Sequence, residues 1–187
     1  MNPWLILGGL AILALVGKRA DIMPKIPSPG KPTDKRRAFV QKIWGMAEKI
    51  ALEKGWKRDI IITQAAHESG WGTSQLAAKY NNLFGFTEGG WQAAGKPVVD
   101  LPTTEWLAGK ATKVSRYFRV YDTWEDSLRD WARLITSYPR YAPAVKAIAQ
   151  GDMRAFSEAM QKAGYATDPT YGAKLARVYG EVERVAV

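Results

Sequence analysis

The chain has 187 residues, 47% of them hydrophobic and 11% aromatic, which is enough for one sizeable core and too little for two ordinary domains. It contains no cysteine, which excludes disulfides, thiolate zinc sites and cysteine nucleophiles. A formal net charge of +9 predicts an anionic partner, such as nucleic acid, a membrane surface or an acidic cell-wall polymer.

The single histidine, His67, narrows the possible chemistry further. It precedes Glu68, but Trp71 stands where the zinc-protease pattern H-E-x-x-H needs its second histidine. We therefore expect no metal site and no cofactor, which leaves carboxylates, tyrosine and bound water for hydrolysis. The sequence shows no zinc finger, RNP-like strand or basic region with heptads, so we expect no nucleic-acid partner.

The N-terminal segment, residues 1–20, is predicted to enter a membrane. Residues 3–17 carry no charge, and Lys18 and Arg19 follow them directly. As a helix this run would extend about 22 Å, against roughly 30 Å of hydrocarbon, so it spans a bilayer only with thinning or snorkelling flanks. Because the basic residues follow the apolar run, we favour an uncleaved anchor over a cleaved signal or a releasable segment. The proline-rich residues 21–33 are expected to form a semi-rigid linker.

Residues 34–187 are predicted to form one α+β domain, mostly helical, with a small β-hairpin lobe. Apolar residues at three- and four-residue steps favour a helix from Thr33 or Asp34 to Gly55. Further helices are expected over residues 56–68, 73–79, 123–138, 152–162 and 169–185, and the one over residues 123–138 is expected to begin with a capping box at Thr123. Between residues 96 and 121, β-type residues on both sides of Gly109 predict a hairpin.

Glu68 is the strongest candidate for a catalytic acid on physical grounds. It is predicted to close a helix, where the macrodipole is negative, and it lies close to Trp71 in the sequence. Both features disfavour ionisation, and a carboxyl that stays protonated near neutral pH can protonate a glycosidic oxygen. The alternative is an ordinary solvated glutamate at a helix end.

Six sequence blocks, taken in order, resemble a known family. They are A-A-H-E-S-G-W-G at residues 65–72, Y-N-N-L-F-G-F at 80–86, T-T-E at 103–105, F-R-V-Y at 118–121, P-R-Y at 139–141 and A-G-Y-A-T-D-P-T-Y at 163–171. From about residue 34 to 185 the chain is similar to the glucosaminidases of glycoside hydrolase family 73, found in flagellar rod proteins and Gram-positive autolysins. The resemblance implies a lysozyme-like fold.

The resemblance also implies roles for individual residues. Glu68 takes the place of the catalytic acid, Glu105 that of a second carboxylate that positions or activates water, and Tyr165 that of a tyrosine assisting at the sugar. The residues expected to bind the substrate are Trp71, Asn81, Asn82, Phe84, Trp91, Trp106 and Tyr171.

Plainer explanations remain for several of these residues. Glu105 fits a solvated strand carboxylate, and Tyr165 fits a side chain packed beside Gly164. His67 departs from the family pattern, and because neighbouring helical positions diverge by about 100°, it is expected to face the core or the cleft wall. The remaining helix tryptophans are expected in the core; they are Trp44, Trp56, Trp124 and Trp131.

The implied activity is hydrolysis of the β-1,4 bond between N-acetylglucosamine and N-acetylmuramic acid in peptidoglycan. Two alternatives are a lytic transglycosylase, in which a glycine-methionine-glutamine block usually replaces N-N-L-F-G, and a non-catalytic wall-binding virion protein. The expected setting is a phage lysin, held in a bilayer by residues 3–17 with its catalytic domain facing the wall, in a virion with an internal membrane or in the host membrane. Export or release from the membrane is the alternative location.

Overall fold

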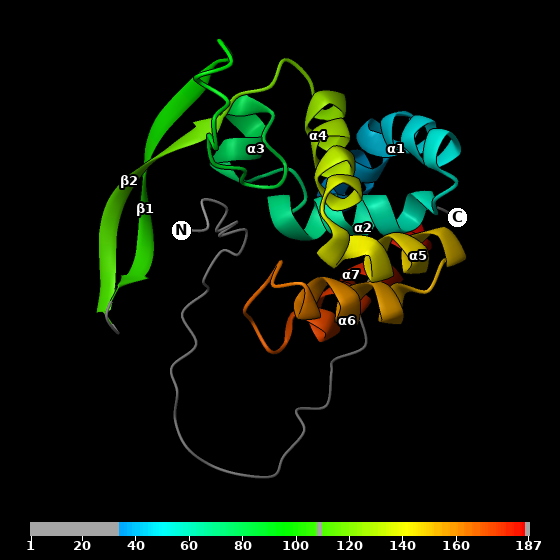
Figure 1. Ribbon diagram of the computed structural model, residues 1–187. Helices are drawn as coiled ribbons and strands as arrows, with labels where there is room; N and C mark the ends of the chain where they lie inside the picture. Colours follow the sequence, from blue (N-terminus) through cyan, green and yellow to red (C-terminus); the bar gives the residue numbers. More distant parts are fainter. Residues whose placement is uncertain (1–33, 108–109, 186–187) are drawn as a thin grey trace.

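The computed structural model describes residues 34–107 and 110–185, and at residues 104–107 and 110–111 it describes the backbone alone. A helical lobe carries an extended two-stranded arm, strands β1 and β2, on one side (Figure 1). This confirms the predicted mostly helical α+β domain. The helices are α1 (Asp34–Lys54), α2 (Arg58–Ser69), α3 (Gln75–Tyr80), α4 (Trp124–Ser137), α5 (Ala142–Gln150), α6 (Met153–Lys162) and α7 (Tyr171–Val185), with a 3-10 turn η1 at Pro139–Tyr141.

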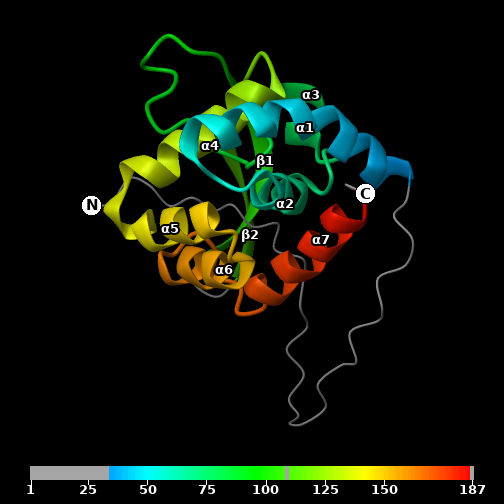
Figure 2. The ribbon, with the colours of Figure 1, turned by 90° about the vertical axis from the view of Figure 1, so that its right-hand side faces the viewer.

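Helix α2 forms the centre of the helical lobe. In Figure 2 it is seen end-on, with α1, α4, α5, α6 and α7 arranged around it. Its residues 60–66 are all fully buried, as expected for a helix that is covered on every side. Two of them, Thr63 and Gln64, are polar and therefore need hydrogen-bond partners inside the protein.

Helices α1 and α4 follow the predicted periodicity. The predicted core positions of α1 from Phe39 to Ala51 are buried, except Trp44, which is partly exposed beneath the Arg58 guanidinium. At the start of α4, the Thr123 hydroxyl accepts from the Asp126 amide while the Asp126 carboxylate accepts from the Thr123 amide. The predicted capping box is therefore present, with both members satisfied.

Helix α5 and turn η1 were not predicted from the sequence. Residues 139–150 contain Pro139 and Pro143 and lie between the helices expected over residues 123–138 and 152–162; a proline breaks a helix when it lies in the interior. In the structure each proline occupies the first turn, where its missing amide hydrogen costs no helical bond. The buried residues Ala144, Ala147 and Ile148 then fix α5 against the core.

The predicted hairpin is also present, formed by β1 (Val98–Leu107) and β2 (Lys110–Arg119) in antiparallel register. Its base is attached to the helical lobe through backbone bonds from the Arg119 amide to the Phe86 carbonyl, 2.9 Å, and from the Glu88 amide to the Tyr117 carbonyl, 2.8 Å. The arm is therefore held at its base and projects beyond the helices (Figure 1).

The predicted membrane segment, residues 1–20, and the linker, residues 21–33, lie outside the described residues. Among the helices of the described part, none is both long and apolar enough to cross a bilayer.

Candidate active site

Glu68 lies in the last turn of α2, one residue before the helix ends at Ser69. Because residues 60–66 are buried on all sides, the end of the helix is held rigidly, and Glu68 with it. The helix terminates at Gly70, which has the left-handed conformation common at this position (φ 58°). Glu68 itself is partly buried.

The E-S-G-W-G motif forms a tightly held turn after Glu68. Gly70, Trp71 and Gly72 are all left-handed, with φ of 58°, 59° and 74°. For tryptophan this conformation is unfavourable and has to be imposed by the surroundings. The buried Ser69 hydroxyl contributes to this, because it donates to the Ala65 carbonyl at 2.6 Å and accepts from the Gly72 amide at 2.7 Å. Ser69 therefore fixes the turn that carries Trp71 directly after α2.

One carboxylate oxygen of Glu68 is bound from two directions. The Gln64 side-chain amide donates to Oε1 at 3.0 Å, and the Tyr171 hydroxyl lies 3.2 Å from the same oxygen. Gln64 is one helical turn before Glu68, whereas Tyr171 begins α7. Oε2 has no hydrogen-bond partner among the described residues.

The surroundings favour the protonated form of this carboxyl group. Burial raises the pKa of Glu68 to about 8, and the hydrogen bond from Tyr171 acts in the opposite direction by stabilising the ionised form. At neutral pH the group therefore keeps its proton. Burial was the cause expected from the sequence, together with the helix dipole.

Tyr165 lies close to Glu68 but is not hydrogen-bonded to it. Its side chain is buried, and its hydroxyl has no partner of normal geometry within the described part of the chain. Burial raises the pKa of Tyr165 well above its usual value, and the nearby Glu68 charge raises it further. The ring packs between those of Tyr141, 6.1 Å away, and Tyr171, 6.4 Å away. Of the two tyrosines predicted for the site, Tyr171 is the one that contacts Glu68.

His67 faces the wall of the site. It is partly buried, and its ring meets the Tyr171 ring edge-on at 5.4 Å. Burial lowers the pKa of His67, and the nearby Lys174 lowers it further, so the imidazole is neutral at pH 7. This agrees with the expectation that His67 packs against the core or the cleft wall.

Glu105 and Trp106 both belong to strand β1, but their side chains lie outside the described residues. By register Glu105 pairs with Thr112 and shares a row with Leu101, Thr103 and Val114. Leu101, Thr103 and Val114 of that row are partly buried. The other row has exposed side chains at Asp100, Pro102, Lys113 and Ser115. Glu105 therefore occupies the less exposed row of the hairpin.

Asn81 and Asn82 connect the hairpin to the helical lobe. Asn81 is left-handed (φ 54°), and its amide donates to the backbone carbonyls of Tyr121 and Asp122. The fully buried Asn82 donates to the carbonyls of Phe86 and Arg119 and accepts from the Phe86 amide. Every one of these bonds is to the protein's own backbone. The structure thus gives both residues a structural role at the base of the arm.

Phe84 and Trp71 differ in their access to solvent. Phe84 is buried and stacks on Trp131 with the ring planes 9° apart, so it lies in the core and not on a cleft surface. Trp71 is partly buried, with its ring edge-on to Phe39 at 5.9 Å and the Arg36 guanidinium 5.4 Å from its centre. Of these two, only Trp71 is partly exposed, and its printed ring contacts are with Phe39 and Arg36 of α1.

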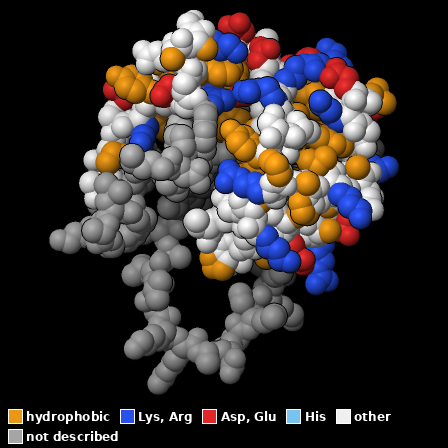
Figure 3. Space-filling view, in the orientation of Figure 1, with side chains coloured by type: hydrophobic (Ala, Val, Ile, Leu, Met, Phe, Trp, Pro, Cys, Tyr) orange, Lys and Arg blue, Asp and Glu red, His pale blue; other side chains and the backbone are white. Residues whose placement is uncertain are grey.

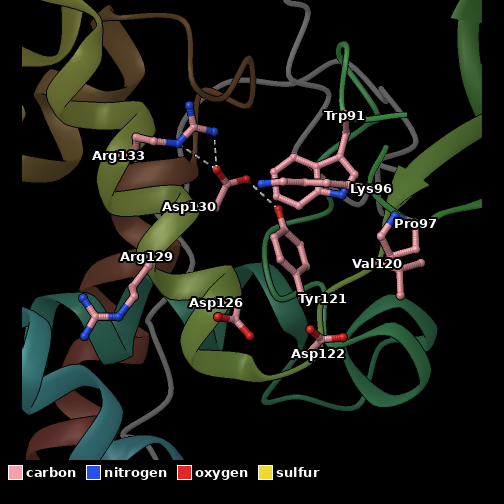
Figure 4. Close-up of a pocket in the computed structure, with 10 residues that line it drawn as sticks. All are labelled: Trp91, Lys96, Pro97, Val120, Tyr121, Asp122, Asp126, Arg129, Asp130 and Arg133. Carbon is pink, nitrogen blue, oxygen red and sulfur yellow. Dashed lines mark hydrogen bonds and ion pairs between the residues drawn. The ribbon is translucent and has the colours of Figure 1, made fainter. Parts of the chain in front are cut away.

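Trp91 lies at a separate cavity of about 390 Å³ between the base of the hairpin and α4 (Figure 4). The Lys96 ammonium lies 3.9 Å and the Arg119 guanidinium 4.8 Å from the indole centre. Asp130 accepts from the Tyr121 hydroxyl in the same cavity. Glu68 does not line this cavity. The Trp91 ring therefore lies away from Glu68 and contacts the side chains of Lys96 and Arg119.

Gln64 was missed by the sequence analysis. A signal was available, because Gln64 interrupts the apolar run at residues 60–66 and precedes Glu68 by four positions. Residues four apart share a helix face, so a polar side chain there is placed to contact the acid. Within the described residues, no group of three histidine, aspartate or glutamate side chains is arranged to hold a metal ion.

A carboxyl that stays protonated at neutral pH, at the end of the central helix of a helical domain with a hairpin arm, is the arrangement expected of a glycoside hydrolase of the lysozyme type. The family model Glucosaminidase, described as mannosyl-glycoprotein endo-beta-N-acetylglucosaminidase, matches residues 44–184. The chain therefore belongs to the glucosaminidase family and is a glycoside hydrolase.

Solved structures and curated relatives agree with this assignment. The structure is similar to a peptidoglycan hydrolase from Sphingomonas sp. A1, with a TM-score of 0.65 and 35% identity over 80% of this chain and 93% of the other. The sequence is 37% identical to "Peptidoglycan hydrolase FlgJ" of Escherichia coli (strain K12) over 80% of this chain and 48% of FlgJ. It is 35% identical to "Exo-glucosaminidase LytG" of Bacillus subtilis (strain 168) over 78% of this chain and 51% of LytG. The chain thus spans about half the length of these curated relatives.

Proposed function

We propose that the protein hydrolyses peptidoglycan at the β-1,4 bond between N-acetylglucosamine and N-acetylmuramic acid, with Glu68 as the general acid. The observation that carries the proposal is that burial raises the pKa of Glu68 to about 8. A carboxyl in that state holds a transferable proton near neutral pH. A solvated glutamate, the alternative left open by the sequence, would already be ionised.

In the proposed reaction the proton leaves Glu68 for the glycosidic oxygen as the bond from that oxygen to the anomeric carbon breaks. The bond's electron pair stays on the leaving oxygen, and positive charge develops at the anomeric carbon. The substrate's 2-acetamido oxygen or an enzyme carboxylate stabilises this charge. Water then adds its oxygen at the same carbon, and the proton that the water loses returns to Glu68. Glu105 and Tyr165 are proposed to orient the acetamide or the water.

Peptidoglycan is proposed as the substrate on two grounds. The first is that FlgJ and the Sphingomonas protein are both named as peptidoglycan hydrolases. The second is charge: Lys and Arg number 27 against 18 Asp and Glu, and basic side chains are spread over the helical lobe on the face shown in Figure 3. A basic surface attracts anionic wall polymers.

The bond that is cut can be tested by mass spectrometry of purified sacculi after digestion. The proposal predicts fragments with reducing N-acetylglucosamine ends. Reducing N-acetylmuramic acid ends would instead indicate a muramidase, and a 39% identical relative is named "Probable N-acetylmuramidase". Anhydro-muramic ends would indicate a lytic transglycosylase, and either result would contradict the proposed bond.

A non-catalytic wall-binding protein is the second class of function. Zymography in a gel containing peptidoglycan separates the two classes. A clearing band at the size of the 20.8 kDa chain supports the enzyme, whereas binding to sacculi without clearing supports the alternative.

The cellular setting is proposed from the sequence upstream of the domain. Residues 3–17 form an uncharged run that would enter the membrane, and residues 21–33 form a proline-rich spacer. Together they would hold the domain on a membrane with its site facing the wall. We propose that a phage uses this arrangement for wall penetration or host lysis. Flotation of the full chain with liposomes, compared with a chain lacking residues 1–20, tests the anchor, and mass spectrometry of purified virions tests the phage setting.

A further inference from the structure

We propose that Gln64 and Tyr171 are positioning residues for the acid: they hold Oε1 of Glu68, present Oε2 as the oxygen that delivers the proton, and stabilise the carboxylate formed afterwards. The inference rests on the proposed role of Glu68 as general acid. It assigns to Tyr171 a contact with the enzyme's own carboxyl, whereas the sequence suggested a contact with the substrate.

The three side chains form a closed hydrogen-bonded group. The Gln64 amide nitrogen lies 3.0 Å from Oε1 of Glu68 and 2.7 Å from the Tyr171 hydroxyl, so its two hydrogens serve both partners. Gln64 is completely buried and Tyr171 is 2% exposed. Because water is excluded from these two groups, their polar atoms depend on each other and on Glu68.

The Tyr171 hydroxyl has one hydrogen and two acceptors within reach. Oε1 of Gln64 lies at 3.0 Å and Oε1 of Glu68 at 3.2 Å. When Glu68 is protonated, the amide oxygen of Gln64 is the better acceptor. When Glu68 is ionised, its Oε1 becomes the stronger acceptor, because hydrogen bonds to a charged group are shorter and stronger. Rotation of the Tyr171 hydroxyl about its Cζ–O bond moves the hydrogen from Oε1 of Gln64 to Oε1 of Glu68.

This exchange matches the two states of the acid in one turnover. Before the reaction, the proton is on Oε2, the oxygen without a partner among the described residues. As Oε2 loses its proton to the leaving oxygen, negative charge spreads to Oε1, where two donors are already in place. Stabilisation that is stronger after proton transfer than before it lowers the barrier of that step.

Other groups around Glu68 do not replace this role. Tyr165 makes no hydrogen bond to Glu68, and its hydroxyl has no partner of normal geometry in the described chain. His67 is neutral at pH 7, since burial and Lys174 lower its pKa. Asp168 and Lys174 are paired with each other. Among the described residues, Gln64 and Tyr171 are therefore the groups that are hydrogen-bonded to the Glu68 carboxyl.

The test compares Tyr171→Phe and Gln64→Met with Tyr141→Phe in the full chain. Tyr141 is the matched control, because it is also a buried tyrosine in this aromatic cluster, and its hydroxyl has no partner among the described residues. In Tyr171→Phe we expect kcat on peptidoglycan to fall about tenfold at pH 7 with KM nearly unchanged, and the alkaline limb of the pH–rate profile to move up by about one pH unit. Gln64→Met should move the limb in the same direction, and Tyr141→Phe should coincide with wild type.

A second readout does not depend on activity. The difference in unfolding free energy between the wild type and Glu68→Gln, measured by urea titration across pH, reports the folded-state pKa of Glu68. The same difference in the Tyr171→Phe background should change over a pH range that extends about one unit higher. If Tyr171→Phe and Gln64→Met fold and this pH range stays where it is in the wild type, the positioning role is wrong, whichever bond the enzyme cuts. A wild type that leaves peptidoglycan intact while the range moves would overturn only the proposed function.

Discussion

The Tyr171 hydroxyl lies 3.2 Å from Oε1 of Glu68, although the two residues are 103 positions apart in the sequence. This contact joins the first residue of α7 to the last turn of α2, so the C-terminal helix closes one side of the candidate site. The acid's environment therefore depends on the docking of α7 as well as on the E-S-G-W-G turn.

Glu68→Gln is expected to remove a pH dependence of stability. The folded-state pKa of Glu68, about 8, is above its ordinary value of 4.5, so the folded protein binds the proton more tightly than the unfolded chain. The wild type is therefore expected to lose about 1.4 kcal/mol of stability from this group for each unit that pH rises between those values, and nothing below that window. Urea titrations between pH 4 and pH 9 measure this. Equal pH slopes in the two proteins would show that Glu68 is not held protonated.

Gly72→Ala should destabilise the fold strongly. A β-carbon at Gly72 would lie 2.6 Å from the Trp124 ring and 3.0 Å from Phe39, and the position is left-handed (φ 74°). We expect a loss of about 3 kcal/mol from overpacking and backbone strain together. Gly55→Ala is the control, because Gly55 is also left-handed (φ 68°) but has no atoms within 4 Å of the added carbon. A loss in Gly72→Ala no larger than that in Gly55→Ala would mean that the core yields to the added carbon.

Asp130→Ala should be among the most destabilising changes outside the site. The buried Asp130 carboxylate pairs with the buried Arg119 guanidinium at 2.5 Å and accepts from the Tyr121 hydroxyl at 2.7 Å. Burial alone would raise the pKa of Asp130, but these bonds and Arg133 hold it below its usual value. Removing the carboxylate leaves Arg119 buried and unpaired, at a cost of about 3–5 kcal/mol in unfolding free energy.

The control for Asp130→Ala is Glu125→Ala on the same helix. Glu125 pairs with Lys49 and Arg129 at the surface, where an ion pair contributes about 1 kcal/mol or less. Chemical denaturation of both variants should separate them by at least about 2 kcal/mol. Similar losses in the two would contradict the role of Asp130 in holding the base of the hairpin.

Salt should weaken wall digestion more than the hydrolysis of a short uncharged chito-oligosaccharide. With a net charge of +9, the protein is attracted to anionic wall polymers over a distance that shrinks from about 10 Å at 0.1 M salt to about 3 Å at 1 M. We expect KM for sacculi to rise with salt and kcat on the oligosaccharide to stay constant. Parallel losses on both substrates would point to an effect of salt on the catalytic site itself.

The fold was largely predictable because its helices have clear apolar periodicity and recognisable ends. The bounds of α1, the Thr123 capping box and the C-terminal end of α2 lie at or beside the residues that the sequence pattern predicted. Helix α5 was not predicted, although its Pro143 lies in the first turn, where a proline is compatible with a helix.

The site was less predictable, because its partnerships join residues that are far apart in the chain. The sequence pattern and the family resemblance pointed to Glu68, but neither shows that Tyr171 contacts it while the hydroxyl of Tyr165 has no partner of normal geometry among the described residues. Asn82 appears in a block expected to line the cleft, yet its amide is bound to buried backbone groups. Which face of a motif meets substrate depends on packing that a local pattern does not contain.

The most direct test of the account is the activity of Glu68→Gln on purified peptidoglycan, beside a wild type prepared in the same way. Glutamine keeps the size of the side chain and its hydrogen bonds to Gln64 and Tyr171 but has no carboxylic acid proton to donate. We predict that the folded variant clears sacculi about 10² to 10⁴ times more slowly than wild type. A folded Glu68→Gln variant that clears sacculi at the wild-type rate would contradict the assignment of Glu68 as the acid.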